Sequence, residues 1–352
     1  MKPLSSVLRF FGTAIYGSVV IWCFGALWFM GSGIVGPTLA FCWAAVVLAG
    51  PRIRPRQETT VSETSAAPSA AISRGRKRVL ISCLCICVLT LFEQPSNDRD
   101  WAADNVAQPK VSIEDGIVTI EMFRNSLHSD SGTEVRYETR SFQLGQLDRV
   151  WFVVQRFTPL EGIAHNFLTF RVMSDSGPEY FSVSAEVRRE QGEEFSPVRG
   201  LYRQYELIYV IADEKDEIGM RTVYSPGDEV YLYPVNANPK QIQGLFRNIA
   251  ARIDGLRSTP EFYHSLLNNC TNNIAWHAND LLTRKVNWLD SRIVAPGYAD
   301  RYAWELGIIG NPDEDFIALK TRCRIDTIAP SQITESFSKE IRRRISDSSQ
   351  TR

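Results

Sequence analysis

The sequence has almost no net charge and none of the common nucleotide-binding or serine-hydrolase motifs. Its 39 Lys and Arg residues nearly balance 40 Asp and Glu residues, and a net charge of -1 gives no sign of a nucleic-acid partner. No GxSxG, P-loop or GxGxxG pattern follows a predicted strand, so a serine hydrolase or a nucleotide-binding enzyme has no motif support. No CxxC or HExxH pair is present either, so we expect neither a metal site nor a cofactor.

Long apolar runs are missing after residue 92 and concentrated before it. A bilayer-spanning helix needs about 20 mainly apolar residues. The sequence predicts three such helices in a membrane region over residues 1–93, at about 11–30, 34–50 and 79–93. The third is short, and we expect Lys77 and Arg78 to lengthen it by extending toward the membrane surface.

The loop after the second segment fixes the predicted orientation. Residues 51–78 read as a flexible, polar linker rich in Ser, Thr, Ala and Pro, with basic residues at both ends. Basic loops stay in the cytoplasm, so three crossings place residues 94–352 on the outer side. A cleaved signal peptide is the alternative, but the first apolar stretch is longer than usual for one and a second stretch follows it. The basic residues are Arg52, Arg54, Arg56, Arg74, Arg76, Lys77 and Arg78.

Residues 94–329 have the mixed, aromatic-rich composition of a globular domain, and 330–352 read as a polar, disordered tail. Alternating apolar residues predict strands, and turn residues between them favour antiparallel pairing of consecutive strands. The predicted strands are 117–123, 150–157, 167–172, 180–187, 207–212, 220–224 and 230–235.

Two helices are predicted after the strands. Asn238-Pro239 is a typical helix start, and apolar residues follow it at intervals of three and four up to Leu256. A second helix is expected to begin around Cys270. The domain is therefore predicted to be α+β, with an antiparallel sheet packed on helices.

Cys270 is the strongest candidate for chemistry, because asparagines surround it at this predicted helix start. Free backbone N–H groups and the positive end of the helix dipole favour a thiolate there, and a thiolate is a nucleophile. The alternative is a structural disulfide with Cys323, since the other five cysteines lie in the predicted membrane segments.

A thiol nucleophile needs a base, and His165 at the start of an apolar strand is the best candidate. Glu186 lies on the next strand, so antiparallel pairing could bring its carboxylate beside the imidazole. His128, His264 and His277 have weaker claims, in predicted loops and on a helix surface.

The charge-dense segment from Glu186 to Glu206 is either a solvated loop or a substrate contact. Guanidinium groups bind phosphate and carboxylate well, so Arg188 and Arg203 are candidates for substrate binding.

Several stretches, taken in order from about residue 98 to 305, resemble the bacterial family of the Lnb N-terminal periplasmic domain, formerly a domain of unknown function. The matching residues are Asp98-Arg99-Asp100-Trp101, Phe123-Arg124-Asn125, Ala164-His165 with Phe170, Ser184-Ala185-Glu186-Val187-Arg188, Gly192-Glu193, Ser196-Pro197, Arg203-Gln204-Tyr205-Glu206-Leu207, Tyr209-Val210 with Asp213-Glu214, and Asn269-Cys270-Thr271.

This resemblance implies a papain-like thiol enzyme of the permuted NlpC/P60 type, with His165 before Cys270 in the chain. It implies a multi-pass bacterial inner-membrane protein with a periplasmic catalytic domain that transfers an acyl group from a lipid or lipoprotein. Supporting or substrate-binding roles would fall to Asn269, Thr271, Tyr205 and Glu206. Two other functions stay open: a cell-wall peptidase or amidase, and a membrane-anchored scaffold without enzyme activity.

Overall fold

The computed structural model describes residues 2–31, 33–49, 68–157, 159, 161–225, 227–279, 282, 284–311 and 313–345. The chain divides into two compact units, one formed by residues 1–94 with 202–204 and the other by residues 95–201 with 205–352. Positions 51–67 of the predicted linker and 346–352 of the predicted tail lie outside the described residues.

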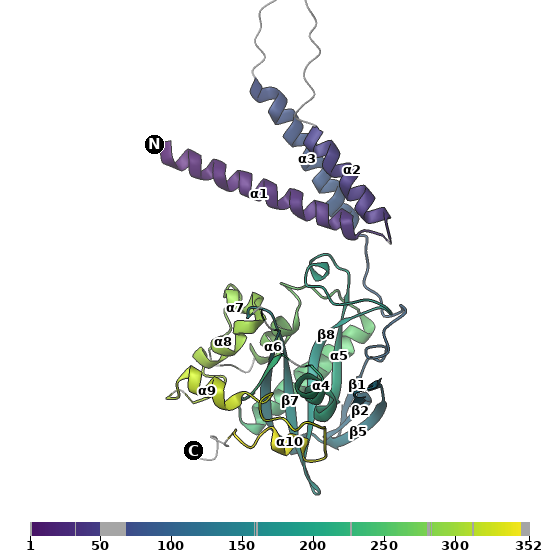
Figure 1. Cartoon of the computed structure of the whole chain (residues 1–352), viewed down its shortest axis with the longest axis vertical. Helices are drawn as coiled ribbons and strands as arrows, with labels where there is room; N and C mark the ends of the chain where they lie inside the picture. Colours follow the sequence, from purple (N-terminus) through teal and green to yellow (C-terminus); the bar gives the residue numbers. More distant parts are fainter. Residues whose placement is uncertain are drawn as a thin grey trace, which may run out of the picture. The chain divides into compact units, whose positions relative to one another are not determined.

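The first unit, the helical unit, contains three helices, α1 (Lys2–Phe29), α2 (Val35–Ala49) and α3 (Pro68–Thr90). They overlap the three predicted membrane segments (Figure 1). Among the described residues, one helix is both long and apolar enough to cross a membrane, over Phe10–Phe29. The apolar part of α2, Val35–Leu48, is shorter. In α3 a basic stretch precedes the apolar residues and lowers the mean hydropathy of the helix.

The second unit, the globular unit, is built on a mixed eight-stranded sheet. Seven of its strands follow the order β1-β2-β9-β8-β7-β6-β10, and β5 pairs with β2. β6, β7, β8 and β9 are consecutive antiparallel strands, which confirms the predicted pairing in this part of the sheet. β2 and β9 are parallel at Arg124 and Ala212, so the prediction of a purely antiparallel sheet is wrong. The bounds are β1 (Lys110–Glu114), β2 (Ile117–Arg124), β5 (Tyr137–Gln143), β6 (Leu147–Arg156), β7 (Ala164–Ser174), β8 (Gly177–Arg188), β9 (Glu206–Asp213) and β10 (Glu229–Pro234), with a separate hairpin of β3 (Leu127–Ser129) and β4 (Gly132–Glu134).

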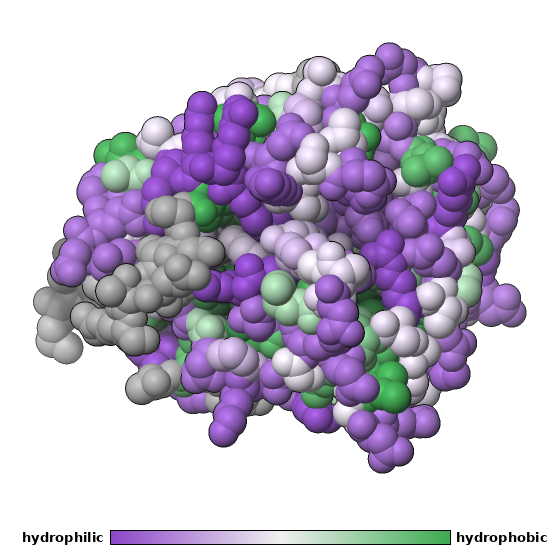
Figure 2. Space-filling model, turned by 90° about the horizontal axis from the view of Figure 1, so that it is seen from below, coloured by the Kyte–Doolittle hydropathy of each residue, from purple (hydrophilic) through white to green (hydrophobic). Residues whose placement is uncertain are grey.

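Hydrophobic cores cover both faces of this sheet, because successive strand residues point to opposite sides. In β6, Phe152 and Val154 belong to the larger core, whereas Trp151 and Val153 belong to the smaller one. Helix α5 (Pro239–Ser258) fills the larger core with its apolar side and begins at the predicted Asn238 cap. The face of the molecule drawn in Figure 2 is mostly hydrophilic, with scattered apolar residues, as expected of a surface in water.

The predicted strand at 220–224 is wrong, because residues 214–223 form helix α4 (Glu214–Val223). The Asp213 side chain accepts a hydrogen bond from the backbone N–H of Lys215 and caps the helix, and three acidic residues in the first turn suit its positive end. Ile218 packs into the smaller core from this helix.

The predicted disorder from residue 330 is also wrong for residues 330–345, which are folded. Phe337, Ile341 and Ile345 are buried in the smaller core, so this polar segment still covers part of the sheet. The remaining helices are α6 (Cys270–Asn279), α7 (Ser291–Val294), α8 (Ala299–Glu305), α9 (Phe316–Cys323) and α10 (Phe337–Glu340).

Candidate active site

Cys270 is the first residue of α6, and the residue before it caps the helix. The Asn269 side chain accepts a hydrogen bond of 2.9 Å from the backbone N–H of Asn272. The Asn272 side chain in turn accepts one of 3.1 Å from the backbone N–H of Asn269. This reciprocal cap fixes the first turn and places the thiol at the positive end of the helix.

His165 and Glu186 meet where β7 and β8 separate. The backbone pairing of the two strands ends at Leu168 and Val183, three residues after His165 on β7 and three residues before Glu186 on β8. In the gap beyond, Nε2 of His165 lies 2.9 Å from Oε1 of Glu186 and 2.7 Å from Oγ of Ser184. The Ser184 hydroxyl donates to the same Glu186 oxygen at 2.8 Å.

In their ionised forms, the Cys270 thiolate, the His165 imidazolium and the Glu186 carboxylate carry negative, positive and negative charge in turn. Burial lowers the pKa of His165, but the Glu186 carboxylate and Cys270 outweigh burial and raise it to about 10. Burial raises the pKa of Cys270, but His165 and the backbone N–H of Asn166 outweigh it and hold that pKa below its usual value. Burial opposes the charge of Glu186 too, yet His165, Arg221 and Ser184 lower its pKa. The arrangement favours a thiolate beside an imidazolium near neutral pH.

A hydrogen bond links the neighbours of the thiol and the imidazole. Nδ2 of Asn166 donates to Oγ1 of Thr271 at 2.8 Å and to the backbone carbonyl of Pro296 at 3.0 Å. Asn166 is fully buried, and Thr271 is the second residue of α6. This Asn166–Thr271 brace joins β7 to the start of α6.

The thiol and imidazole line a cavity of about 650 Å³ whose other walls are largely apolar. Cys270 is 3% exposed, so a substrate would reach the sulfur through this cavity. The volume falls within the usual range for small-molecule sites. The apolar walls include Phe157, Ile163, Phe195, Val198, Leu201, Met220, Leu266 and Val294.

Arg188, Tyr205 and Glu206, predicted to support the site or to bind substrate, make structural contacts away from the cavity. Arg188 is buried over the ring of Trp101 and donates to the backbone carbonyls of Asn105 and Val106. The hydroxyl of Tyr205 donates to the carbonyl of Glu194 at 2.7 Å, and Glu206 accepts from the backbone N–H of Ser96 at 3.1 Å. None of the three lines the cavity around Cys270, and Arg203 belongs to the other compact unit.

The other histidines of the globular unit and the second cysteine have separate surroundings. His277 is a buried core residue that shares a hydrogen bond of 2.6 Å with the hydroxyl of Tyr209. Nδ1 of His264 accepts from the backbone of its own loop, and His128 contacts Asp216 at 2.8 Å. Cys270 and Cys323 are both free thiols, so the alternative of a disulfide between them is wrong for this structure.

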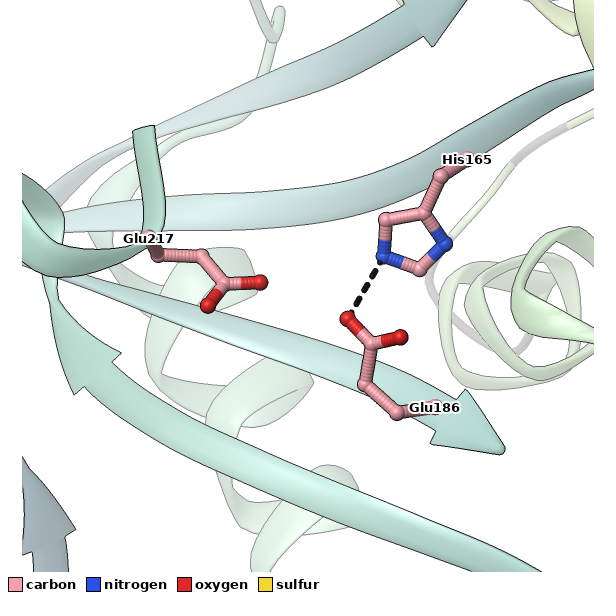
Figure 3. Close-up of side chains that lie close together, drawn as sticks. All are labelled: His165, Glu186 and Glu217. Carbon is pink, nitrogen blue, oxygen red and sulfur yellow. Dashed lines mark ion pairs between the residues drawn. The ribbon is translucent and has the colours of Figure 1, made fainter. Parts of the chain in front are cut away.

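Figure 3 shows the imidazole of His165 and the carboxylates of Glu186 and Glu217 turned toward one another from β7, β8 and α4. Their potential ligand atoms lie within 4.8 Å of each other, which is close enough to consider a metal ion. Arg221, however, contacts both carboxylates, at 3.2 Å and 2.9 Å, and Arg124 contacts Glu217 as well. Two guanidinium groups already neutralise these carboxylates, so the donor set fits a metal ion poorly.

Sequence reasoning missed Ser184 and Arg221. Ser184 precedes Glu186 by two residues on a predicted strand, so the alternation of side chains could have placed both on one face. Arg221 could not be found in this way, because its segment was predicted to be a strand and forms α4.

Comparison with known proteins agrees with the family resemblance. Residues 133–297 match the family model described as the Lnb N-terminal periplasmic domain. No curated protein and no solved structure matches the chain. With the apolar helix over Phe10–Phe29, this match indicates a membrane-anchored protein that carries a periplasmic domain. The part of the chain that is similar to the Lnb N-terminal periplasmic domain family, residues 133–297, includes His165, Glu186 and Cys270.

Proposed function

We propose that this protein is a membrane-anchored thiol acyltransferase that takes an acyl group from a lipid or lipoprotein ester. The observation that carries the proposal is the apolar cavity of about 650 Å³ around Cys270 and His165. An acyl chain is apolar and gains by leaving water, so such walls suit it. A cell-wall peptide would instead need hydrogen-bonding partners along the cavity, and a peptidase or amidase is therefore the weaker candidate.

In the proposed first step, Sγ of the Cys270 thiolate attacks the carbonyl carbon of the ester. The tetrahedral oxyanion is stabilised by backbone N–H groups at the start of α6. The carbon–oxygen bond to the leaving alcohol then breaks, and the His165 imidazolium gives its proton to that alcohol. The products of this step are a Cys270 thioester and a neutral imidazole.

In the second step an amine attacks the thioester. The neutral His165 takes the proton that the amine loses, the carbon–sulfur bond breaks, and the thiolate returns. Glu186 remains ionised throughout and stabilises the imidazolium whenever it forms. Water in place of the amine would make the same enzyme a hydrolase.

The membrane part of the proposal keeps three crossings, made by α1, α2 and α3, with the basic 51–78 segment in the cytoplasm. The globular unit would then be on the periplasmic side. Anchoring raises the effective concentration of a lipid substrate near the domain. The permuted papain-like fold implied by the family resemblance belongs to the same proposal.

The test is mass spectrometry of lipoprotein amino termini from cells that produce the wild-type protein or Cys270→Ala. We expect the lipoproteins from Cys270→Ala cells to lack the transferred acyl group completely. Cys323→Ala is the matched control, because it removes the other free thiol of the globular unit while leaving the cavity lining unchanged. It should keep wild-type acylation.

A second measurement follows the enzyme itself. Purified wild-type protein incubated with a phospholipid should gain the mass of one acyl chain on the peptide that contains Cys270, and hydroxylamine should remove it. Identical lipoprotein termini in wild-type and Cys270→Ala cells would reject the transferase. If the acyl adduct still forms in that case, the protein is an acyl hydrolase; cleavage of cell-wall peptides without any acyl adduct would establish the peptidase.

A further inference from the structure

Helix α4 brings a second carboxylate and an arginine behind Glu186. Glu217 and Arg221 are one helical turn apart and almost fully buried. Nη2 of Arg221 lies 3.2 Å from Oε1 of Glu186, and its Nη1 lies 2.9 Å from Oε1 of Glu217. Arg221 is therefore the group that lies between the two carboxylates.

Without that arginine, the two carboxylates would repel each other. One oxygen of each carboxylate and one nitrogen of His165 lie within 4.8 Å of one another. Two carboxylates at such a distance share a site in which one of them tends to take up a proton. Protonation of Glu186 would remove the negative charge that stabilises the His165 imidazolium.

We propose that Arg221 is a positioning residue that keeps Glu186 anionic and directed at His165, and so maintains the reactive thiolate of Cys270. The proposal rests on the role of Cys270 and His165 in the proposed function. It concerns the free enzyme, however, and needs no acyl substrate.

Charged and titratable residues approach His165 and Glu186 from several neighbouring elements. Cys270 approaches His165 from α6, and Arg221 and Glu217 approach Glu186 from α4. Burial, with Cys270 and Glu186 nearby, raises the pKa of Tyr263, so this phenol stays neutral. On the far side, Arg124 contacts Glu217, and its Nε lies 2.9 Å from Oδ2 of Asp216. Arg124 also interacts electrostatically with Glu186. Among the described ion pairs, however, it is Arg221 that contacts both Glu186 and Glu217 directly.

The test is the pH dependence of Cys270 alkylation by iodoacetamide in the full-length protein, followed on the Cys270 peptide by mass spectrometry. Arg221→Met keeps an unbranched side chain over the ring of Phe167, where the guanidinium lies 5.0 Å from the ring centre. We expect the half-maximal pH of alkylation to rise by about one unit, which is roughly a tenfold loss of rate on the acidic side of the transition.

Two further variants separate charge from folding. The double variant Arg221→Met with Glu217→Gln removes the competing carboxylate as well, so its alkylation profile should return toward that of the wild type. Arg221→Lys keeps one positive charge and should shift the profile less than Arg221→Met does. Thermal unfolding of each variant shows whether the domain is folded.

A wild-type alkylation profile in folded Arg221→Met overturns the proposal, as does a shift that the double variant fails to reverse. If Arg221→Met does not fold, Arg221→Gln takes its place, because it also removes the positive charge and keeps both carboxylates. A wild-type midpoint of alkylation in folded Arg221→Gln overturns the proposal. If wild-type protein forms no acyl adduct on Cys270 while the alkylation profiles shift as expected, the proposed function fails and the role of Arg221 stands.

Discussion

The two cysteines of the globular unit differ in their electrostatic surroundings. Cys270 has an imidazole beside it and a pKa below the usual thiol value, whereas burial raises the pKa of Cys323 to about 12. Cys270 should lose its proton at a lower pH than an ordinary thiol, and Cys323 at a higher pH, because the two pKa values are shifted in opposite directions.

Iodoacetamide at about pH 7, below the usual pKa of a thiol, should therefore label Cys270 in the native protein much faster than Cys323. Peptide mass spectrometry separates the two positions from the cysteines of the helical unit. His165→Ala removes the positive partner and should reduce Cys270 labelling at this pH by roughly tenfold or more. Equal labelling of both cysteines, or an unreactive Cys270, would contradict the charge assignment.

At the scale of the residue, sequence reasoning predicted that Glu186 lies beside His165, but it did not predict the contacts that Ser184 and Arg221 make with them. The order of strands led to Glu186 as a neighbour of His165, and the structure brings these side chains to 2.9 Å. Arg188, Tyr205 and Glu206 instead hold loops around the domain. A charged residue in a sequence looks the same whether it binds a substrate or a backbone carbonyl, so this distinction needs the tertiary structure.

Secondary-structure elements were predictable where the local pattern was strong. β6, β7, β8, β9 and β10 and the start of α5 follow from alternation and from the Asn238 cap. The segment of α4 was misassigned because its few apolar residues fit a short strand, and tertiary packing of Ile218 decides for the helix. β1 was missed because it is short and has only two apolar residues, and β5 because charged and polar residues interrupt its alternation.

The caps of α5 and α6 offer a matched pair of substitutions. Asn269→Ala and Asn238→Ala each remove a side-chain acceptor from a reciprocal cap, and each should lower the free energy of unfolding by about 1 kcal/mol. Urea unfolding measures this loss. Only Asn269→Ala should also slow alkylation of Cys270, because only that cap holds the turn that carries the thiol.

Slower alkylation in Asn238→Ala as well would mean that the thiol responds to overall stability instead of to its own cap. Unchanged alkylation in Asn269→Ala would show that β7 and the cavity walls fix Cys270 without the cap.

At the scale of the whole molecule, the sheet depends on both cores, and the second is completed by the last described residues. Phe337 is fully buried against the face of the sheet that carries Trp151 and Val153. The sequence suggested a disordered tail because its apolar residues are separated by many polar ones. Such spacing allows single side chains to enter a core even when the segment as a whole is polar.

Phe337→Ala should lower the free energy of unfolding by about 3–5 kcal/mol, as expected for loss of a buried phenyl ring. Urea unfolding is again the measurement. Ile317→Ala on α9 truncates an apolar side chain that is 72% exposed and should have little effect. Similar small losses in both variants would mean that the 330–345 segment adds no stability to the sheet.

The Asn166–Thr271 brace has a consequence for motion. It joins Asn166, the residue after His165, to Thr271, the residue after Cys270, although these positions are 105 apart in the chain. A displacement of α6 away from the sheet must therefore break this buried 2.8 Å hydrogen bond before sulfur and imidazole can part. Cys270 and His165 should therefore move together when the protein binds a bulky ligand. The cavity would then widen by movement of the apolar walls opposite them.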